Sequence, residues 1–487
     1  MSASLRPVPQ RFAAAFLGVL AFALPSPAFA ASEIEAITPA AAARLDAAVH
    51  DAAAKTPGLS VAVAEDGRVA YAHGVGFADV AAKRAVTPET RFRIASITKM
   101  FTAVSVMQLV ERGQIGLDDR VARYLPDAPH AAEITIRQLL THTSGLWNYG
   151  DEAFISGRVV TPTTPQAIVA SAAAHPLTEK PGAGFAYTNT GYVLLGLVVE
   201  AVTREPLARY EAEHIYGPAG MHATTNGDPA DGDVSRGYES AAGKPAPPFV
   251  TSWVYGDGDI VSTASDLARF DIALMSGKLV TPATFALMQS ASVDASSIAP
   301  GVRYGLGLMI VSSGGVTFVG HHGGMPGFEA ENEMLPSSSF AMAVLSNAFD
   351  YPTPLANQAV LSIAAPAILA RAAAAAKTAA AADALPGPED PAITMRLRAF
   401  FAALQLGEVD RAGATAEVNG ALTADALAAL KAQLGPLGSI SSLTFVDRRN
   451  GGGVTRYRYR ATFSSGKQLP ITFALDADGK VAGFFFE

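Results

Sequence analysis

A serine and a lysine lie three residues apart at the start of an apolar segment. Ser96 and Lys99 belong to the stretch RIASITKMFTAV, and residues 100–110 are apolar on nearly every face, as is typical of a helix buried in a large domain. Residues three apart on a helix are neighbours, so the amine can reach the hydroxyl. Burial lowers the pKa of a lysine, which would let Lys99 act as the base for a serine nucleophile. The plainer alternative is that Lys99 extends to the surface and Ser96 only caps the helix.

The same spacing occurs a second time in a different setting. Ser464 and Lys467 lie in SSGKQ, a pattern typical of a hairpin turn, and a turn has no helical face to align the two side chains. At the start of a helix, by contrast, the backbone N–H of Ser96 has no partner within the helix and can bind an oxyanion. Ser96 and Lys99 are therefore the candidate pair for chemistry.

Two further motifs follow in the chain. Tyr187 and Asn189 form a Y-x-N pattern in FAYTNTGY, and His321 begins an H-x-G pattern in VGHHGGMPGF. The three motifs occur in the order expected of the penicillin-recognising serine hydrolases, which include class C β-lactamases, DD-peptidases, D-aminopeptidases and β-lactamase-like esterases. The chain resembles this superfamily across about residues 40–370.

The resemblance implies acyl transfer through a serine ester. Ser96 attacks a carbonyl, Lys99 and Tyr187 share the proton transfers, and Asn189 contacts a substrate amide. The N–H groups of Ser96 and Gly324 stabilise the oxyanion. No metal or organic cofactor is required, and the partner is a small-molecule or peptide substrate.

The third motif departs from the pattern of many relatives. His322-Gly323-Gly324 also fits H-x-G, but family spacing to Pro326-Gly327 favours His321 as the first residue, at the edge of the cleft. Many β-lactamases and DD-peptidases carry lysine there to attract a substrate carboxylate, and a neutral imidazole is a poorer anion anchor. We therefore expect a serine hydrolase of small esters or D-amino-acid peptides, with β-lactam hydrolysis weak or absent.

Several alternatives follow from the same residues. A class C-like β-lactamase or a DD-carboxypeptidase fits the three motifs, and a non-catalytic sensor or interaction protein could keep the fold. His142, in LLTHTSGL, invites a Ser/His/Asp triad, but the chain contains no G-x-S-x-G nucleophile elbow. Metal chemistry is unsupported, since H-E-x-x-H and cysteine are both lacking.

Composition and the N-terminal pattern restrict the possible partners and the cellular location of the protein. The chain has 487 residues, 49% hydrophobic and 16% charged, with a net charge of −8, so a nucleic-acid partner is not expected. Residues 1–30 have the basic start, short apolar core and A-x-A end of a secretory signal peptide. With the high alanine content of a GC-rich bacterial genome, this pattern predicts a periplasmic or secreted protein without a stable membrane span.

The elements that must position these residues suggest an α+β fold. Residues 59–76 alternate like two strands joined at Asp66-Gly67, and further strand patterns begin at Tyr304, Val316 and Phe340. Helical patterns fill the region between. One antiparallel sheet built from both chain ends is therefore expected, flanked by helices with an all-helical insertion, over residues 31–372.

A second, smaller domain is predicted beyond an alanine- and proline-rich linker. The linker covers residues 373–391, and residues 392–487 read as helices followed by four strands. Their topology loosely resembles the NTF2-like folds. This α+β domain could mediate self-association, bind a partner or shield the cleft. Residues 356–370 predict a helix covering the sheet, because they are short for a span and contain Pro366.

Overall fold

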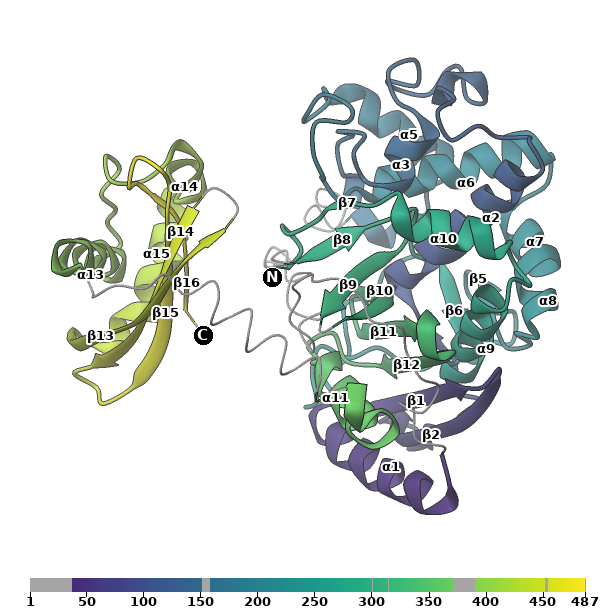
Figure 1. Ribbon diagram of the computed structural model, residues 1–487, viewed down its shortest axis with the longest axis horizontal. Helices are drawn as coiled ribbons and strands as arrows, with labels where there is room; N and C mark the ends of the chain where they lie inside the picture. Colours follow the sequence, from purple (N-terminus) through teal and green to yellow (C-terminus); the bar gives the residue numbers. More distant parts are fainter. Residues whose placement is uncertain are drawn as a thin grey trace. The chain divides into compact units, whose positions relative to one another are not determined.

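The computed structural model describes residues 37–150, 158–299, 301–313, 315–368, 370, 390–451 and 454–486. The chain divides into two compact units, Met1–Ala376 and Lys377–Glu487, each described here by itself (Figure 1). The leader predicted for residues 1–30 lies outside the described residues, as do residues 373–389 of the predicted linker.

The first unit is built on a nine-stranded antiparallel sheet in the order β3-β2-β1-β12-β11-β10-β9-β8-β7. Strand β1 pairs with β12 and places Leu59 opposite Ser346, so the sheet joins the two ends of this unit, as predicted. The strands are β1 (Gly58–Glu65), β2 (Arg68–Asp79), β3 (Arg84–Ala85), β7 (Val293–Asp294), β8 (Val302–Tyr304), β9 (Met309–Ser313), β10 (Val316–Met325), β11 (Phe328–Leu335) and β12 (Phe340–Ser346).

The hairpin of β1 and β2 turns at the predicted dipeptide. Asp66 and Gly67 have φ values of 50° and 74°, and a two-residue turn with both φ angles positive matches the twist of the strands it joins. Asp-Gly is favoured there because both residues tolerate the left-handed region.

Helices cover both faces of the sheet (Figure 1). Alternate strand residues point to opposite faces: Leu59, Val61 and Val63 pack with α1 (Pro39–Ala52) and α11 (Thr353–Ala364). On the other face, Ala62 and Ala64 belong to the core that also contains α2 (Thr98–Glu111) and α9 (Ala264–Met275). The predicted covering helix is thus α11.

Helix α2 is buried over its whole first part, since every residue from Thr98 to Leu109 is buried. This agrees with a sequence that is apolar on nearly every face. The helix ends at Glu111, and Gly113 follows with φ 68°, the left-handed conformation that glycine adopts after a helix.

A helical region fills the middle of the first unit, as predicted. It contains α3 (Ile136–Leu140), α5 (Pro165–Ser171), α6 (Asn189–Thr203), α7 (Leu207–Glu211), α8 (Gly217–Ala219) and α10 (Pro282–Ser290). A small three-stranded sheet in the order β4-β6-β5 was not anticipated. It is formed by β4 (Phe92–Arg93), β6 (Ile260–Ser262) and β5 (Thr225–Asn226), and β4 leads directly to Ser96.

Two strand predictions differ from the structure. The pattern beginning at Tyr304 is divided between β8 and β9, because the chain bends over Gly305–Leu308; a Cβ at Gly305 would lie 2.1 Å from the Met288 carbonyl oxygen. Strand β11 was missed because its sequence, FEAENEML, carries three glutamates. Glu331 and Glu333 are nevertheless buried.

The second unit is a four-stranded antiparallel sheet packed against helices. The sheet order is β13-β14-β15-β16, formed by β13 (Ile440–Gly451), β14 (Val454–Phe463), β15 (Gln468–Leu475) and β16 (Val481–Phe486). Helices α13 (Pro391–Leu406), α14 (Ala416–Ala421) and α15 (Ala424–Leu434) share its core. Ser464 and Lys467 lie in the turn between β14 and β15, and neither belongs to a helix.

Within the described ranges, no helix combines the length and the apolar character that a membrane crossing needs.

Candidate active site

Ser96 and Lys99 lie where a short 3₁₀ turn, Ala95–Ile97, runs into α2. The Nζ atom of Lys99 is 2.9 Å from Ser96 Oγ, within hydrogen-bond distance. Lys99 is fully buried, whereas Ser96 is only half-buried. Lys99 therefore does not extend to the surface, and its amine meets a hydroxyl that solvent can reach.

The backbone around Ser96 is held in an unusual conformation. Ala95 has φ 48°, the left-handed region that costs a residue with a Cβ about 1–2 kcal/mol. Strand β10 approaches so closely that a Cβ on Gly323 would lie 2.2 Å from the Ile94 carbonyl oxygen and 3.1 Å from Ser96 N. Only glycine fits this approach of β10 to the serine.

The amine of Lys99 is enclosed by polar and aromatic groups. Its Nζ donates to the Asp257 carbonyl oxygen at 2.8 Å and lies 5.0 Å from the ring centre of Tyr187 and 5.7 Å from that of Tyr192. Burial lowers the pKa of Lys99 to about 8, and the charge of Asp257 opposes this shift. A substantial fraction of the lysine is therefore a neutral amine near pH 8, the state in which it can accept a proton.

Tyr187 and Asn189 lie at the N-terminus of α6. Burial raises the pKa of Tyr187 well above its usual range, and a hydrogen bond with Ser96 opposes that rise. Asn189 is the first residue of α6, and its N–H donates to Asn148 Oδ1 at 3.0 Å. Its own Oδ1 is buried and has no hydrogen-bond partner among the described residues. The structure thus brings Tyr187 to the serine–lysine pair; a contact of Asn189 with substrate stays a prediction.

His321 is buried completely, with both ring nitrogens engaged by the protein. Its Nδ1 lies 2.5 Å from the His322 carbonyl oxygen and must donate, so Nε2 accepts from the Tyr304 hydroxyl at 2.9 Å. Burial and the nearby charge of Lys99 lower the pKa of His321 to about 3. The ring is therefore neutral, and its expected contact with substrate stays a prediction.

Gly324, the second expected oxyanion donor, follows on β10. Its neighbour Gly323 touches the backbone at Ser96, whereas a Cβ on Gly324 would face the carboxylate of Glu329 at 3.2 Å. Strand β10 thus runs beside Ser96 at this point, and the role of the Gly324 N–H stays a prediction.

His142, the candidate for a Ser/His/Asp triad, lies behind Tyr187. Its ring centre is 4.2 Å from that of Tyr187 and 4.6 Å from that of Tyr304, and its Nδ1 accepts from the Thr188 N–H at 3.2 Å. Burial, with the charge of Lys99, lowers the pKa of His142 well below its usual value. Its φ is 55°. His142 is a neutral ring in a turn that supports Tyr187.

Asp257, which lies beside the lysine, was not predicted from the sequence. Asp257 is buried, and its carboxyl oxygens are 3.1 and 3.0 Å from the Tyr149 hydroxyl. Burial raises the pKa of Asp257 to about 6, while Lys99 and the Tyr149 hydrogen bond oppose the rise. No spacing rule connects Asp257 with a lysine 158 residues earlier in the chain.

The positive charge of His322 was not predicted from the sequence either. Its Nε2 lies 2.9 Å from Glu329 and its Nδ1 lies 3.2 Å from Glu331, both on β11. Although burial lowers the pKa of His322, the two glutamates raise it to about 10. His322 is therefore an imidazolium on the face of β10 opposite His321.

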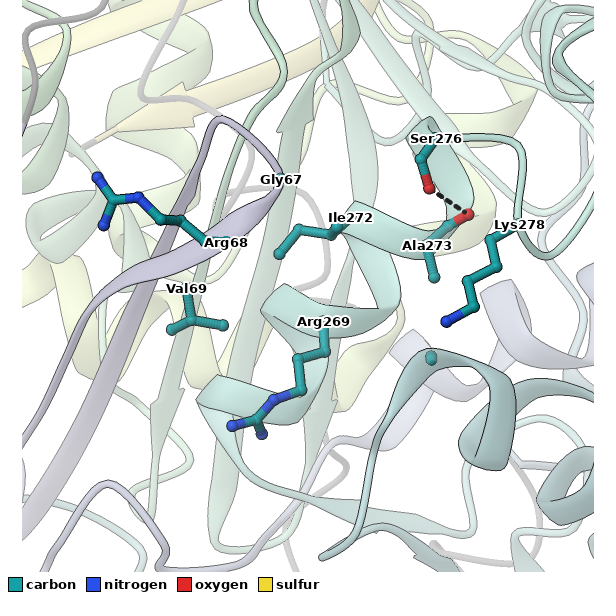
Figure 2. Close-up of a pocket in the computed structure, with 9 residues that line it drawn as sticks. Gly67, Arg68, Val69, Arg269, Ile272, Ala273, Ser276 and Lys278 are labelled. Carbon is teal, nitrogen blue, oxygen red and sulfur yellow. Dashed lines mark hydrogen bonds between the residues drawn. The ribbon is translucent and has the colours of Figure 1, made fainter.

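None of these residues lines the cavity drawn in Figure 2. That cavity has a volume of about 340 Å³ and lies between the β1–β2 hairpin and α9, with Arg68, Arg269 and Lys278 on its wall. Arg269 is paired with Asp266 at 2.6 Å. Across the described part of the chain, no group of three or more His, Cys, Asp or Glu side chains is arranged to hold a metal ion.

The sheet, the helical region and the buried lysine beside a half-buried serine together define a serine hydrolase of the β-lactamase-like class. A family model described as Beta-lactamase matches residues 45–367, and the chain belongs to that family.

Many known proteins are similar to the chain, among them two bacterial enzymes and an archaeal penicillin-binding protein homologue. A D-aminopeptidase of Brucella anthropi is 29% identical over 57% of this chain, which spans about half (53%) of that relative's length. The crystal structure of D-amino acid amidase from Ochrobactrum anthropi SV3, complexed with L-phenylalanine amide, is 28% identical with a TM-score of 0.60, covering 66% of this chain and 98% of the amidase. An octameric penicillin-binding protein homologue from Pyrococcus abyssi is 26% identical with a TM-score of 0.57, covering 91% of this chain and 98% of its own.

Proposed function

We propose that the protein hydrolyses small esters or D-amino-acid-containing peptides and amides through an acyl-enzyme at Ser96. One observation carries this proposal: a buried lysine amine lies 2.9 Å from the hydroxyl of a half-buried serine. Burying an ammonium is costly unless it is hydrogen-bonded, so a fully buried lysine indicates a functional role.

In the proposed reaction, the neutral amine of Lys99 takes the proton of Ser96 Oγ as that oxygen bonds to the substrate carbonyl carbon. The oxyanion binds the N–H groups of Ser96 and Gly324, a contribution of roughly 3–4 kcal/mol per donor. Tyr187 passes a proton to the leaving nitrogen or oxygen as its bond to the acyl carbon breaks. Water then attacks the ester and the same groups act in reverse.

The D-aminopeptidase and the D-amino acid amidase support the proposed substrate class. The third motif supports weak or absent β-lactam hydrolysis, since His321 is neutral and both its nitrogens are engaged. A carboxylate-bearing substrate would find no charge on that imidazole to attract it.

The test compares the wild-type protein with Ser96→Ala on three substrates: a p-nitrophenyl ester, D-alanine p-nitroanilide beside its L-enantiomer, and a chromogenic cephalosporin. Ser96-dependent cleavage of the ester or of the D-anilide, with little cephalosporin turnover, is expected. A lasting Ser96-dependent penicillin adduct seen by intact mass would favour a DD-carboxypeptidase, and fast cephalosporin hydrolysis a β-lactamase. If every activity survives Ser96→Ala, the nucleophile is assigned wrongly. If no activity exists in a folded protein, the non-catalytic sensor is favoured.

We also propose that the C-terminal unit mediates self-association. The octameric relative supports this, because its likeness covers 91% of this chain and thus extends into that unit. Light scattering should then give a multiple of the mass of one chain, which is 50.2 kDa with the leader included. A mass of one chain at micromolar concentration would refute the proposal.

The leader pattern of residues 1–30 supports a periplasmic or secreted location. Expression of the full chain in a bacterium should then yield a shortened mature protein outside the cytoplasm. A full-length product retained in the cytoplasm would contradict this proposal.

A further inference from the structure

Asp257 contacts Lys99 through its backbone carbonyl, and its buried carboxyl acts on the same amine through its charge. The loop that carries it lies against α2 at two successive turns: Lys99 Nζ donates to the Asp257 carbonyl oxygen at 2.8 Å, and Thr102 Oγ1 donates to the Gly256 carbonyl oxygen at 2.7 Å. A neutral lysine amine has two N–H bonds and one lone pair. With one N–H held by the Asp257 carbonyl, rotation of the amine is restricted and the lone pair can point at Ser96 Oγ.

The carboxyl of Asp257 lies in a buried hydrogen-bond arrangement with Tyr149, and the direction of its hydrogen bonds depends on whether the carboxyl is protonated. The Tyr149 hydroxyl lies 2.5 Å from the Trp253 carbonyl oxygen and 3.0 and 3.1 Å from the two Asp257 carboxyl oxygens. A hydroxyl has a single proton to donate. When Tyr149 donates to Trp253, only a protonated Asp257 can donate to the Tyr149 oxygen. When Asp257 is ionised, the Tyr149 proton must turn to the carboxylate.

From this arrangement we infer that Asp257 is a positioning residue whose carboxyl sets the protonation state of Lys99, and hence the pH at which Ser96 becomes nucleophilic. The inference rests on the proposed function, because it concerns the same serine–lysine pair. The relation is reciprocal: an ionised Asp257 favours the ammonium form of Lys99, and the ammonium favours the carboxylate.

Among the titratable groups around the pair, Asp257 is the acid whose charge affects the pKa of Lys99. The titratable side chains that lie around Lys99 or Asp257 come from several elements, and they are Tyr149, Tyr187, Tyr192, Asp259, His142 and His321. Burial holds both histidines neutral and the three tyrosines protonated, and raises the pKa of Asp259 well above its usual value. Burial lowers the pKa of Lys99, and the one opposing charge is that of Asp257.

The decisive variant is Asp257→Asn, which removes the charge and keeps an oxygen that can accept from Tyr149. Without the carboxylate, the Lys99 ammonium loses its stabilising charge, so the amine becomes neutral at a lower pH. The acid limb of Ser96 reactivity is then expected to move to lower pH, on the order of one pH unit. A merely structural role for Asp257 would lower stability or overall rate without moving this limb.

The measurement is the rate at which a fluorophosphonate labels Ser96, followed by intact mass across the pH range in which both groups titrate. This probe reports on the nucleophile without requiring the natural substrate. Asp271→Asn is the matched control, because Asp271 is also a fully buried carboxyl, bonded to Asn332 at 2.8 Å. It should change stability but leave the acid limb in place.

Each outcome is decisive. Wild-type labelling at Ser96 with an unmoved limb in Asp257→Asn would overturn the inference and leave the proposed function standing. If Asp257→Asn does not fold, Tyr149→Phe replaces it: loss of that hydrogen bond keeps Asp257 neutral to higher pH, so the limb should move in the same direction, and an unmoved limb overturns the inference. Absence of Ser96 labelling at every pH would overturn the proposed function and the inference together.

Discussion

The close approach of β10 to Ser96, the proposed nucleophile, can be tested by adding one methyl group. In Gly323→Ala, the new Cβ would lie 2.2 Å from the Ile94 carbonyl oxygen and 3.1 Å from Ser96 N. The strand and the 3₁₀ turn must separate by about 1 Å to restore a normal contact. Overpacking of this kind costs about 1–3 kcal/mol of stability. A displacement of about 1 Å at the reacting group can lower the rate by about 10²-fold, which is the loss expected here.

The assay measures kcat/KM on a p-nitrophenyl ester together with the free energy of unfolding in urea. Gly58→Ala serves as control, since its Cβ would lie 2.6 Å from the Phe77 carbonyl oxygen, in the same sheet but away from Ser96. The control should lose stability while each folded molecule keeps its activity. If Gly323→Ala loses stability but keeps the wild-type kcat/KM, the reasoning fails, because Ser96 would then tolerate the displaced strand.

Three further results are expected. The wild-type kcat/KM should rise with pH through about 8, since burial lowers the pKa of Lys99 to about that value and only the neutral amine is a base; a rate that is flat from pH 6 to pH 9 contradicts this. His142→Asn should lower kcat/KM by less than the roughly 10²–10⁴-fold expected for loss of a general base, and a loss as large as in Ser96→Ala would restore the triad. His322→Gln should cost about 3–5 kcal/mol of unfolding free energy at acidic to neutral pH. Because the folded pKa of His322 is raised to about 10 from 6.5, its contribution is complete below pH 6.5 and is lost as pH rises through 10; urea titrations that show a constant difference across this range would be the opposing result.

The local patterns of the sequence were enough to predict that Ser96 and Lys99 lie together. Ser96 and Lys99 are neighbours because of helix periodicity. Because the helix is apolar on nearly every face, its lysine is buried with the rest of it. The hairpin at Asp66-Gly67 follows from backbone conformations that few other dipeptides adopt. Both inferences depend on residues close in the chain, where spacing alone fixes geometry.

Contacts between segments that are distant in the chain could not be predicted from the sequence. Strand β11 was missed because its glutamates read as solvent-facing, yet Glu331 is buried where it meets His322 from the next strand. Asp257 reaches Lys99 only after 158 residues of intervening chain have folded. The left-handed backbone at Ala95 also gives no sign, because alanine is not a residue that favours it.

The two adjacent histidines of the third motif show why register decides the chemistry of this site. Neighbouring residues on a strand face opposite sides of the sheet, so His321 meets Tyr304 and the charge of Lys99, while His322 meets two glutamates. The pKa of His321 falls to about 3 through burial and Lys99; that of His322 rises to about 10 because its glutamates outweigh burial. The ring on the Lys99 side of the strand is therefore neutral, and the ring on the opposite side is a cation. With Gly323 against Ser96, the strand presents the neutral ring on the side of Lys99, which agrees with our proposal of substrates that do not depend on a carboxylate anchor at that position.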